Sequence, residues 1–240
     1  MKKRTLKIIS ITIALLLGIA FIAKFGLSSL LRVYIEAGMG NCQKIPILCM
    51  APTEEIINPA IDKDYAAELL SYKFPKMTVC MEKCFNVVQE MVKKVYYKKN
   101  KRFYKGSVIY VLYQEPNFFV QLFPQLKKYG VTDNYEFIKR LMYAKVTGIA
   151  NINDAFFVIM KGIFTPDLGQ QKNVKMAKFA VGEKKGFINY NFSKSGSYFD
   201  CNIVEADGGF FKLYIKDNDA KLDLTKVLTI ITKIENTELN

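Results

Sequence analysis

The sequence predicts an α+β protein, in which an N-terminal transmembrane helix precedes one domain with an antiparallel sheet packed by helices. Three observations lead to this prediction. An apolar run, Ile8–Ala23, follows a cluster of cations. Segments with helical periodicity occupy the middle of the chain, and four strand-like segments joined by turn residues occupy its last third. The chain has 240 residues, 50% of them hydrophobic, which is enough for one sizeable domain beside the N-terminal segment.

The N-terminal run is interpreted as a retained membrane anchor. Its apolar character resumes after Lys24 and continues to Leu31, so the segment exceeds the roughly 20 residues that span a bilayer. A cleaved signal peptide is a second interpretation, but cleavage after Ala23 would place the large side chain of Phe21 where a small residue is preferred. A buried helix of a soluble protein is a third. The N-terminal cations predict a cytoplasmic N-terminus and an extracytoplasmic domain in the cell membrane.

The anchor divides the chain into three predicted parts. Residues 1–35 form the anchor. Residues 36–62 form a juxtamembrane lead-in, because its glycines and prolines interrupt regular structure. Residues 63–240 form a single extracytoplasmic domain.

The middle of the chain alternates between strand and helix periods. Met77, Val79 and Met81 alternate as in a half-buried strand, and the segment SVIYVLYQ after Gly106 has the near-continuous apolarity of a central strand. Apolar residues at helical spacing follow possible caps at Thr132 and Asn153. The predicted elements are a strand at 76–81, a helix at 84–98, a strand at 107–114, a helix around or after Pro124, a helix at 132–145 and a helix at 154–164.

The last third of the chain predicts a four-stranded meander and a final helix. Short joints rich in turn residues imply antiparallel neighbours, and Asp223 can cap the last helix. The strands are expected at 174–181, 186–192, 198–204 and 209–216. This order of elements is similar in layout to a Mog1/PsbP-like sandwich, an analogy of fold that implies no function.

The cysteines allow several interpretations. In an oxidising compartment Cys42, Cys49, Cys80 and Cys84 can form disulfides, in any of three connectivities. They could equally be unpaired buried thiols. A four-thiolate metal site has an unusual spacing here, and redox catalysis lacks a C-x-x-C motif. Cys201 lies in an apolar strand and is expected to be a core thiol.

The segment KKVYYKKNKRFYK is the most basic in the chain, whose net charge is +13. It could be the solvated end of a helix, a contact for an anionic membrane or polyanionic polymer, or a site for single-stranded nucleic acid. The predicted topology disfavours nucleic acid. The residues expected to contact an anionic surface are Lys93, Lys94, Tyr97, Lys98, Lys99, Lys101, Arg102 and Lys105.

No residue pattern predicts catalysis, a cofactor or a metal. The chain has no histidine, which excludes Ser-His-Asp triads, Cys-His dyads and His-ligated zinc. Asp217, Asp219 and Asp223 lack calcium-loop spacing and are expected in a turn and a cap. The numerous phenylalanines are expected in the core, although they could also line a cavity for a lipid-like ligand.

These observations predict a non-enzymatic, membrane-anchored binding or accessory protein with a protein or envelope component as its partner. The alternative is a carrier or sensor of an apolar small molecule or lipid. A thiol oxidoreductase using Cys80 and Cys84 is a third hypothesis.

Overall fold

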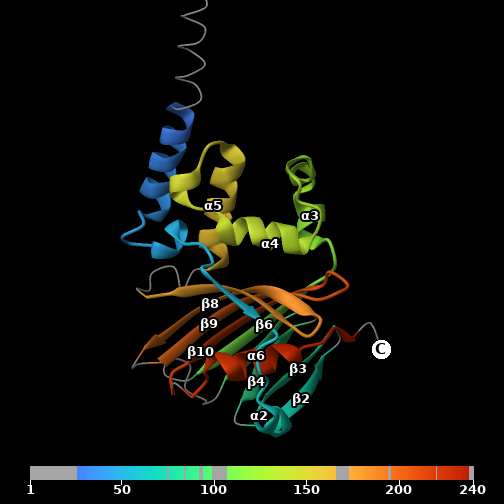
Figure 1. Ribbon diagram of the computed structural model, residues 1–240. Coiled ribbons are helices and arrows are strands. Elements are labelled where there is room, and N and C mark those ends of the chain that lie inside the picture. The colour runs from blue at the N-terminus through green and yellow to red at the C-terminus, as the bar shows by residue number, and fades with distance from the viewer. Residues whose placement is uncertain are drawn as a thin grey trace, which may run out of the picture. The chain divides into compact units, whose positions relative to one another are not determined.

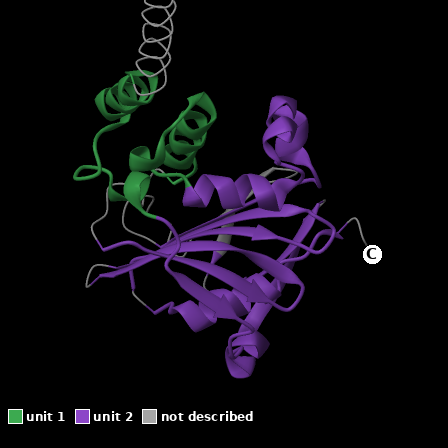
Figure 2. Cartoon of the chain, turned by 45° about the horizontal axis from the view of Figure 1, so that its top comes forward, with its two compact units in different colours: residues 1–50, 144–170 green, residues 51–143, 171–240 purple. Residues whose placement is uncertain are grey.

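The computed structural model describes residues 26–74, 76–83, 85–91, 94–98, 107–165, 173–193, 196–219 and 221–237. The predicted anchor run, Ile8–Ala23, lies outside these residues. Within the described ranges, no helix combines the length and the apolarity needed to cross a membrane. The chain divides into two compact units, which comprise residues 1–50 with 144–170 and residues 51–143 with 171–240 (Figure 2).

The larger unit is built on an eight-stranded sheet in the order β1-β7-β8-β9-β10-β6-β5-β4. All neighbouring strands in it are antiparallel except β1 and β7. The predicted α+β class with a large antiparallel sheet is therefore confirmed, as is the C-terminal meander. The sheet strands are β1 (Glu54–Ile57), β4 (Asn86–Met91), β5 (Lys94–Lys98), β6 (Val108–Gln114), β7 (Lys175–Val181), β8 (Lys184–Ser193), β9 (Gly196–Val204) and β10 (Phe210–Asp217).

One face of this sheet carries the main hydrophobic core. It packs against α6 (Leu224–Thr232) and the hairpin of β2 (Leu69–Phe74) and β3 (Met77–Glu82), which follows α2 (Lys63–Glu68) (Figure 1). The predicted cap is present, because the Lys226 N–H donates to Asp223 Oδ1 at 2.8 Å. β6 is an interior strand as predicted, but its burial alternates, since only one of its faces meets this core.

The other face of the sheet is covered by α4 (Asn134–Tyr143), which packs on β8 and β9 within the same unit (Figure 1). Phe119 of α3 (Phe118–Leu122) stacks on Phe137 with ring centroids 4.3 Å apart. These rings are core side chains, as expected. The cap of α4 is Asp133 and not Thr132, because the Glu136 N–H donates to Asp133 Oδ1 at 2.8 Å. The proline after α3 begins a 3-10 helix, η2 (Pro124–Tyr129).

The predicted helix at residues 84–98 is wrong, because β4 and β5 form an antiparallel pair there. This segment is rich in valine and tyrosine, which favour strands. The spacing of its apolar residues suits a short helix equally well. The segment is a strand because β5 pairs with β6 in the sheet.

The smaller unit contains a helix over residues 26–39, η1 (Pro46–Cys49), η3 (Val146–Gly148) and α5 (Ile152–Phe164). Its buried core includes Ile35, Leu48 and Val158. Asn151, and not Asn153, caps α5 in a capping box with Asp154. The predicted lead-in at 36–62 therefore contributes helical turns to this unit and strand β1 to the larger one.

Candidate functional site

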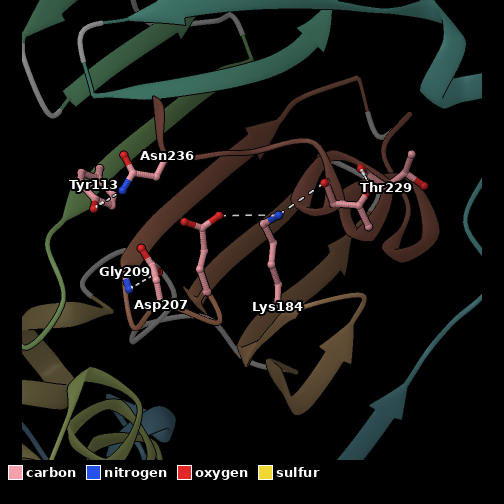
Figure 3. A network of polar contacts seen from close by, with 8 residues as sticks. Tyr113, Lys184, Asp207, Gly209, Thr229 and Asn236 are labelled. Atoms are coloured by element: carbon pink, nitrogen blue, oxygen red, sulfur yellow. Dashed lines mark hydrogen bonds and ion pairs between the residues drawn. The ribbon is translucent and has the colours of Figure 1, made fainter. Parts of the chain in front are cut away.

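A polar pocket lies in the larger unit where the β9–β10 turn meets the start of β8 and the segment after α6. Glu205 and Asp207 come from the turn, and Lys184 begins β8. The C-terminal segment beyond α6 adds Glu235. It also adds Asn236 (Figure 3). The pocket has a volume of ≈ 390 Å³ and is lined by Glu183, Lys184, Glu205, Ala206, Asp207, Glu235 and Asn236.

Glu205 is the group in this pocket whose pKa is shifted most. Its side chain is only 13% exposed, and its Oε1 lies 3.7 Å from Lys184 Nζ. Within the described part of the chain, its buried Oε2 has no hydrogen-bond partner. Burial raises the pKa of Glu205 to about 7; the Lys184 charge opposes this rise, and the charges of Asp207 and Glu235 add to it. This carboxyl group therefore titrates near neutral pH.

The surrounding groups hold the pocket in shape. Lys184 Nζ also donates to the Thr232 carbonyl at 3.5 Å, which ties β8 to the end of α6 (Figure 3). Asn236 Nδ2 donates to the Tyr113 hydroxyl at 2.7 Å. Burial, together with the negative charges nearby, raises the pKa of Tyr113 to about 12, so this phenol stays protonated. The Tyr113–Asn236 bond thus fixes the C-terminal segment at the pocket over the physiological pH range.

The pocket combines a buried carboxyl group with several other charged groups. A carboxyl group that titrates near pH 7 can exchange a proton or receive a cationic group. The other titratable groups that line this pocket are Lys184, which is ion-paired with Glu205, and the carboxyl groups of Glu183, Asp207 and Glu235. The described residues contain no group of three or more Cys, Asp and Glu side chains that could hold a metal ion.

Replacing Glu205 by glutamine is expected to change how stability depends on pH. The pKa of Glu205 rises from 4.5 to about 7 on folding, so its neutral form stabilises the protein fully below pH 4.5 and this contribution is lost as pH rises through 7. The loss amounts to about 3 kcal/mol, because one pKa unit corresponds to about 1.4 kcal/mol. In urea unfolding, the wild type should be less stable at pH 8 than at pH 5. The stability of Glu205→Gln should change much less between these two pH values.

The matched control for this experiment is Glu183→Gln, which removes an exposed carboxylate from the same pocket. It should keep the pH dependence of the wild type. Equal pH dependence in the wild type and Glu205→Gln would contradict the assignment of the titrating group.

A second, larger pocket of the same unit is open and mainly apolar. It has a volume of ≈ 600 Å³, and it lies beside α2 and the end of β7. Its volume falls in the range of small-molecule sites. Its lining consists of Asn58, Pro59, Ile61, Lys63, Ala66, Ala67, Val181, Gly182, Thr232 and Lys233.

The structure describes three of the four cysteines for which disulfides were considered. Cys42 and Cys49 of the smaller unit form a disulfide with a Cα–Cα distance of 5.7 Å. Cys80 lies in β3 as a free thiol, and burial raises its pKa. Cys84 lies outside the described residues. Cys201 is a buried free thiol of the sheet, as expected for a core cysteine.

The structure places three of the residues proposed to contact an anionic surface in one strand. Lys94, Tyr97 and Lys98 belong to β5, which runs between β4 and β6. The interpretation of this segment as a helix end is therefore wrong, and contact with an anionic surface stays a prediction. The remaining residues, Lys93, Lys99, Lys101, Arg102 and Lys105, lie outside the described ranges.

Two buried lysines were not identified from the sequence. Lys212 of β10 forms an ion pair with Asp200, and its Nζ donates to Asn202 Oδ1 at 3.1 Å. This charged group lies on the sheet face that α4 also covers. Lys161 of α5 is 0% exposed and lies in the smaller unit. The sequence signal for Lys161 was its position as the one charged residue among the apolar residues 155–164.

No protein-family model matches this chain, and a search of the curated proteins finds no match.

Proposed function

We propose that this chain is a membrane-anchored binding protein that presents its folded part outside the cytoplasm to a protein or envelope component. The observation that carries the proposal is the pairing of Cys42 with Cys49, whose Cα atoms lie 5.7 Å apart, within the range that a disulfide requires. Disulfides persist in oxidising compartments and are rare in the cytosol. A bonded pair downstream of Ile8–Ala23 agrees with a cytoplasmic N-terminus and an extracytoplasmic domain.

The side chains of the larger unit favour binding over an enzymatic role. In the described part of this unit, Cys80 and Cys201 are free thiols, and burial raises the pKa of each. A raised pKa suppresses the thiolate form that redox catalysis needs. The pKa of Glu205 is raised to about 7, but the carboxyl group is held in an ion pair with Lys184. The transmembrane helix and the Mog1/PsbP-like analogy stay predictions within this proposal.

The test combines membrane extraction, topology and thiol chemistry on the full-length chain. We expect the chain to stay in the membrane pellet after alkaline carbonate, and its domain to be digested by protease added to spheroplasts. Alkylation followed by non-reducing peptide mass spectrometry should yield the peptides of Cys42 and Cys49 joined. The Cys42→Ser/Cys49→Ser variant serves as the control for the peptide assignment. A protease-protected domain with both thiols alkylated would refute the proposal.

The apolar-ligand alternative rests on the open pocket beside α2. Five of its lining residues are proline, isoleucine, alanine or valine, which suit a lipid chain or another apolar molecule. Native mass spectrometry of the same purified protein separates the two functions. A lipid that co-purifies with the wild type and is lost on Ala66→Lys would replace the partner-binding proposal with the carrier.

A further inference from the structure

The helix over residues 26–39 has one apolar face that is occupied within its own unit. Ile35 is 2% exposed and packs in the core of the smaller unit, with Leu31 and Met39 beside it. Arg32 on the same side donates from Nη2 to the Ile149 carbonyl at 3.2 Å. These contacts fix which side of the helix faces inward.

The opposite side of this helix is apolar and exposed. Leu27 is 44% exposed, Leu30 68%, Val33 64% and Tyr34 74%, and Ala37 is also exposed. Leu27, Leu30, Tyr34 and Ala37 follow one another at intervals of three, four and three residues. This is the alternation of the a and d positions of a coiled coil, the pattern by which one helix packs against another. We define these four residues as the seam.

The chain before the seam indicates what can cover it. The apolar run ends at Ala23, four residues before Leu27. Two copies anchored in one membrane would present their seams in parallel and at the same height.

A position flat on a lipid surface fits this helix less well than a contact with another helix. Helices that lie on membranes carry lysines and arginines along the polar side that flanks the apolar face. The segment 26–39 has a single basic residue, Arg32, which is bonded to the Ile149 carbonyl on the inward side. The charge pattern therefore disfavours a helix that lies flat on the membrane surface.

We propose that a second copy of this chain docks on the seam, which forms a parallel, two-fold symmetric contact in the membrane. This inference rests on the proposed function, because the anchor aligns the two copies. In such a contact each seam residue meets the same residue of the other copy or its near neighbour. The anchor also confines both copies to one membrane, which raises their effective concentration. A contact as short as the seam can therefore hold the two copies together.

The test is thiol crosslinking of the full-length chain in native membranes. Leu30→Cys and Tyr34→Cys place thiols on the seam, and a mild oxidant should link two copies into a band of twice the 27.5 kDa mass. Glu36→Cys is the matched control, because Glu36 is exposed on the same helix but outside the seam. It should give little dimer, and so should the wild type.

A disruptive variant makes the test specific. Ala37→Cys also places a thiol on the seam. Adding Leu30→Arg to this variant should lower the yield of crosslinked dimer about tenfold, which corresponds to a loss of about 1.4 kcal/mol of binding free energy. Leu30 is 68% exposed, so the unit itself should still fold.

The outcomes distinguish failure of this inference from failure of the proposed function. If the chain is extracted from membranes by alkaline carbonate, the anchor and the proposed function fail. If the chain is retained but cysteines at positions 30 and 36 crosslink equally, or if neither does, the seam is not a contact between copies. In that case lipid or a different protein covers it.

Discussion

Gly186→Ala is expected to unfold the larger unit. Gly186 lies in β8 opposite Ile203 of β9, near the middle of the eight-stranded sheet. A Cβ atom at this position would lie 1.9 Å from the Asn202 carbonyl oxygen and 2.9 Å from its carbonyl carbon. These are main-chain atoms, so a change of rotamer cannot relieve the overlap, and the two strands would have to separate. We expect a loss of about 4 kcal/mol or more, a large part of the stability of an ordinary domain.

The measurement is urea unfolding followed by circular dichroism, together with the soluble yield of the variant. Gly148→Ala is the control, because a Cβ atom there would meet nothing within 4 Å. Its unfolding midpoint should stay close to that of the wild type. A Gly186→Ala protein with an unchanged midpoint would show that β8 and β9 can move apart at little cost.

The local part of the fold could be predicted from the sequence. The four-stranded meander was predicted because turn residues lie between segments with strand character, and short turns force neighbouring strands to pair. The helix capped by Asp223 was predicted for a similar reason, since its cap and its apolar spacing agree. The strand bounds differ from the predicted ones by one or two residues. β8, for example, already begins at Lys184, because Gly182 and Glu183 alone form the turn, and Gly182 has a φ of 57°.

The non-local part could not be predicted. β1 pairs in parallel with β7, more than a hundred residues away, and no turn signal links the two. The pairing of β5 with β6 likewise depends on the rest of the sheet, which explains the error at residues 84–98. Local periodicity is a weak guide where a short apolar segment suits both a helix and a strand.

The candidate pocket was missed for the same reason. Glu205, Lys184 and Glu235 are ordinary charged residues in the sequence, separated by about twenty to fifty positions. Only the fold brings them together and buries Glu205. The turn that contains Asp207 was identified, but a turn by itself indicates no function.

Lys161 is expected to make the stability of the smaller unit rise with pH. Its Nζ donates to the Met50 carbonyl at 2.6 Å and to the Ala144 carbonyl at 3.0 Å. The smaller unit consists of two chain segments, 1–50 and 144–170. Lys161 therefore joins α5 to Met50, where the first segment ends, and to Ala144, where the second segment begins. Burial lowers the pKa of Lys161 to about 7, and the nearby charge of Lys145 contributes.

The direction of the pH effect follows from this lowered pKa. Between pH 7 and pH 10.5 the unfolded chain keeps the proton on Lys161 and the folded chain releases it. The cost of burying the charge is therefore fully present below pH 7 and is relieved as pH rises. We expect a gain of about 2 kcal/mol from pH 7 to pH 9, since each pKa unit corresponds to about 1.4 kcal/mol.

Lys161→Met separates this effect from the titration of other groups. The variant buries no charge, but it leaves the Met50 and Ala144 carbonyls without this donor, at about 1–3 kcal/mol each. Its deficit relative to the wild type should therefore be about 2 kcal/mol larger at pH 9 than at pH 7. Hydrogen exchange of the amides of the smaller unit measures this difference.

The control for this experiment is Lys145→Met, which removes an exposed lysine. It should preserve the rise in stability with pH, shifted to slightly higher pH because Lys161 loses a repulsive neighbour. A deficit of Lys161→Met that is the same at both pH values would mean that Lys161 stays charged in the folded protein. Its two carbonyl contacts would then compensate the cost of burial without release of the proton.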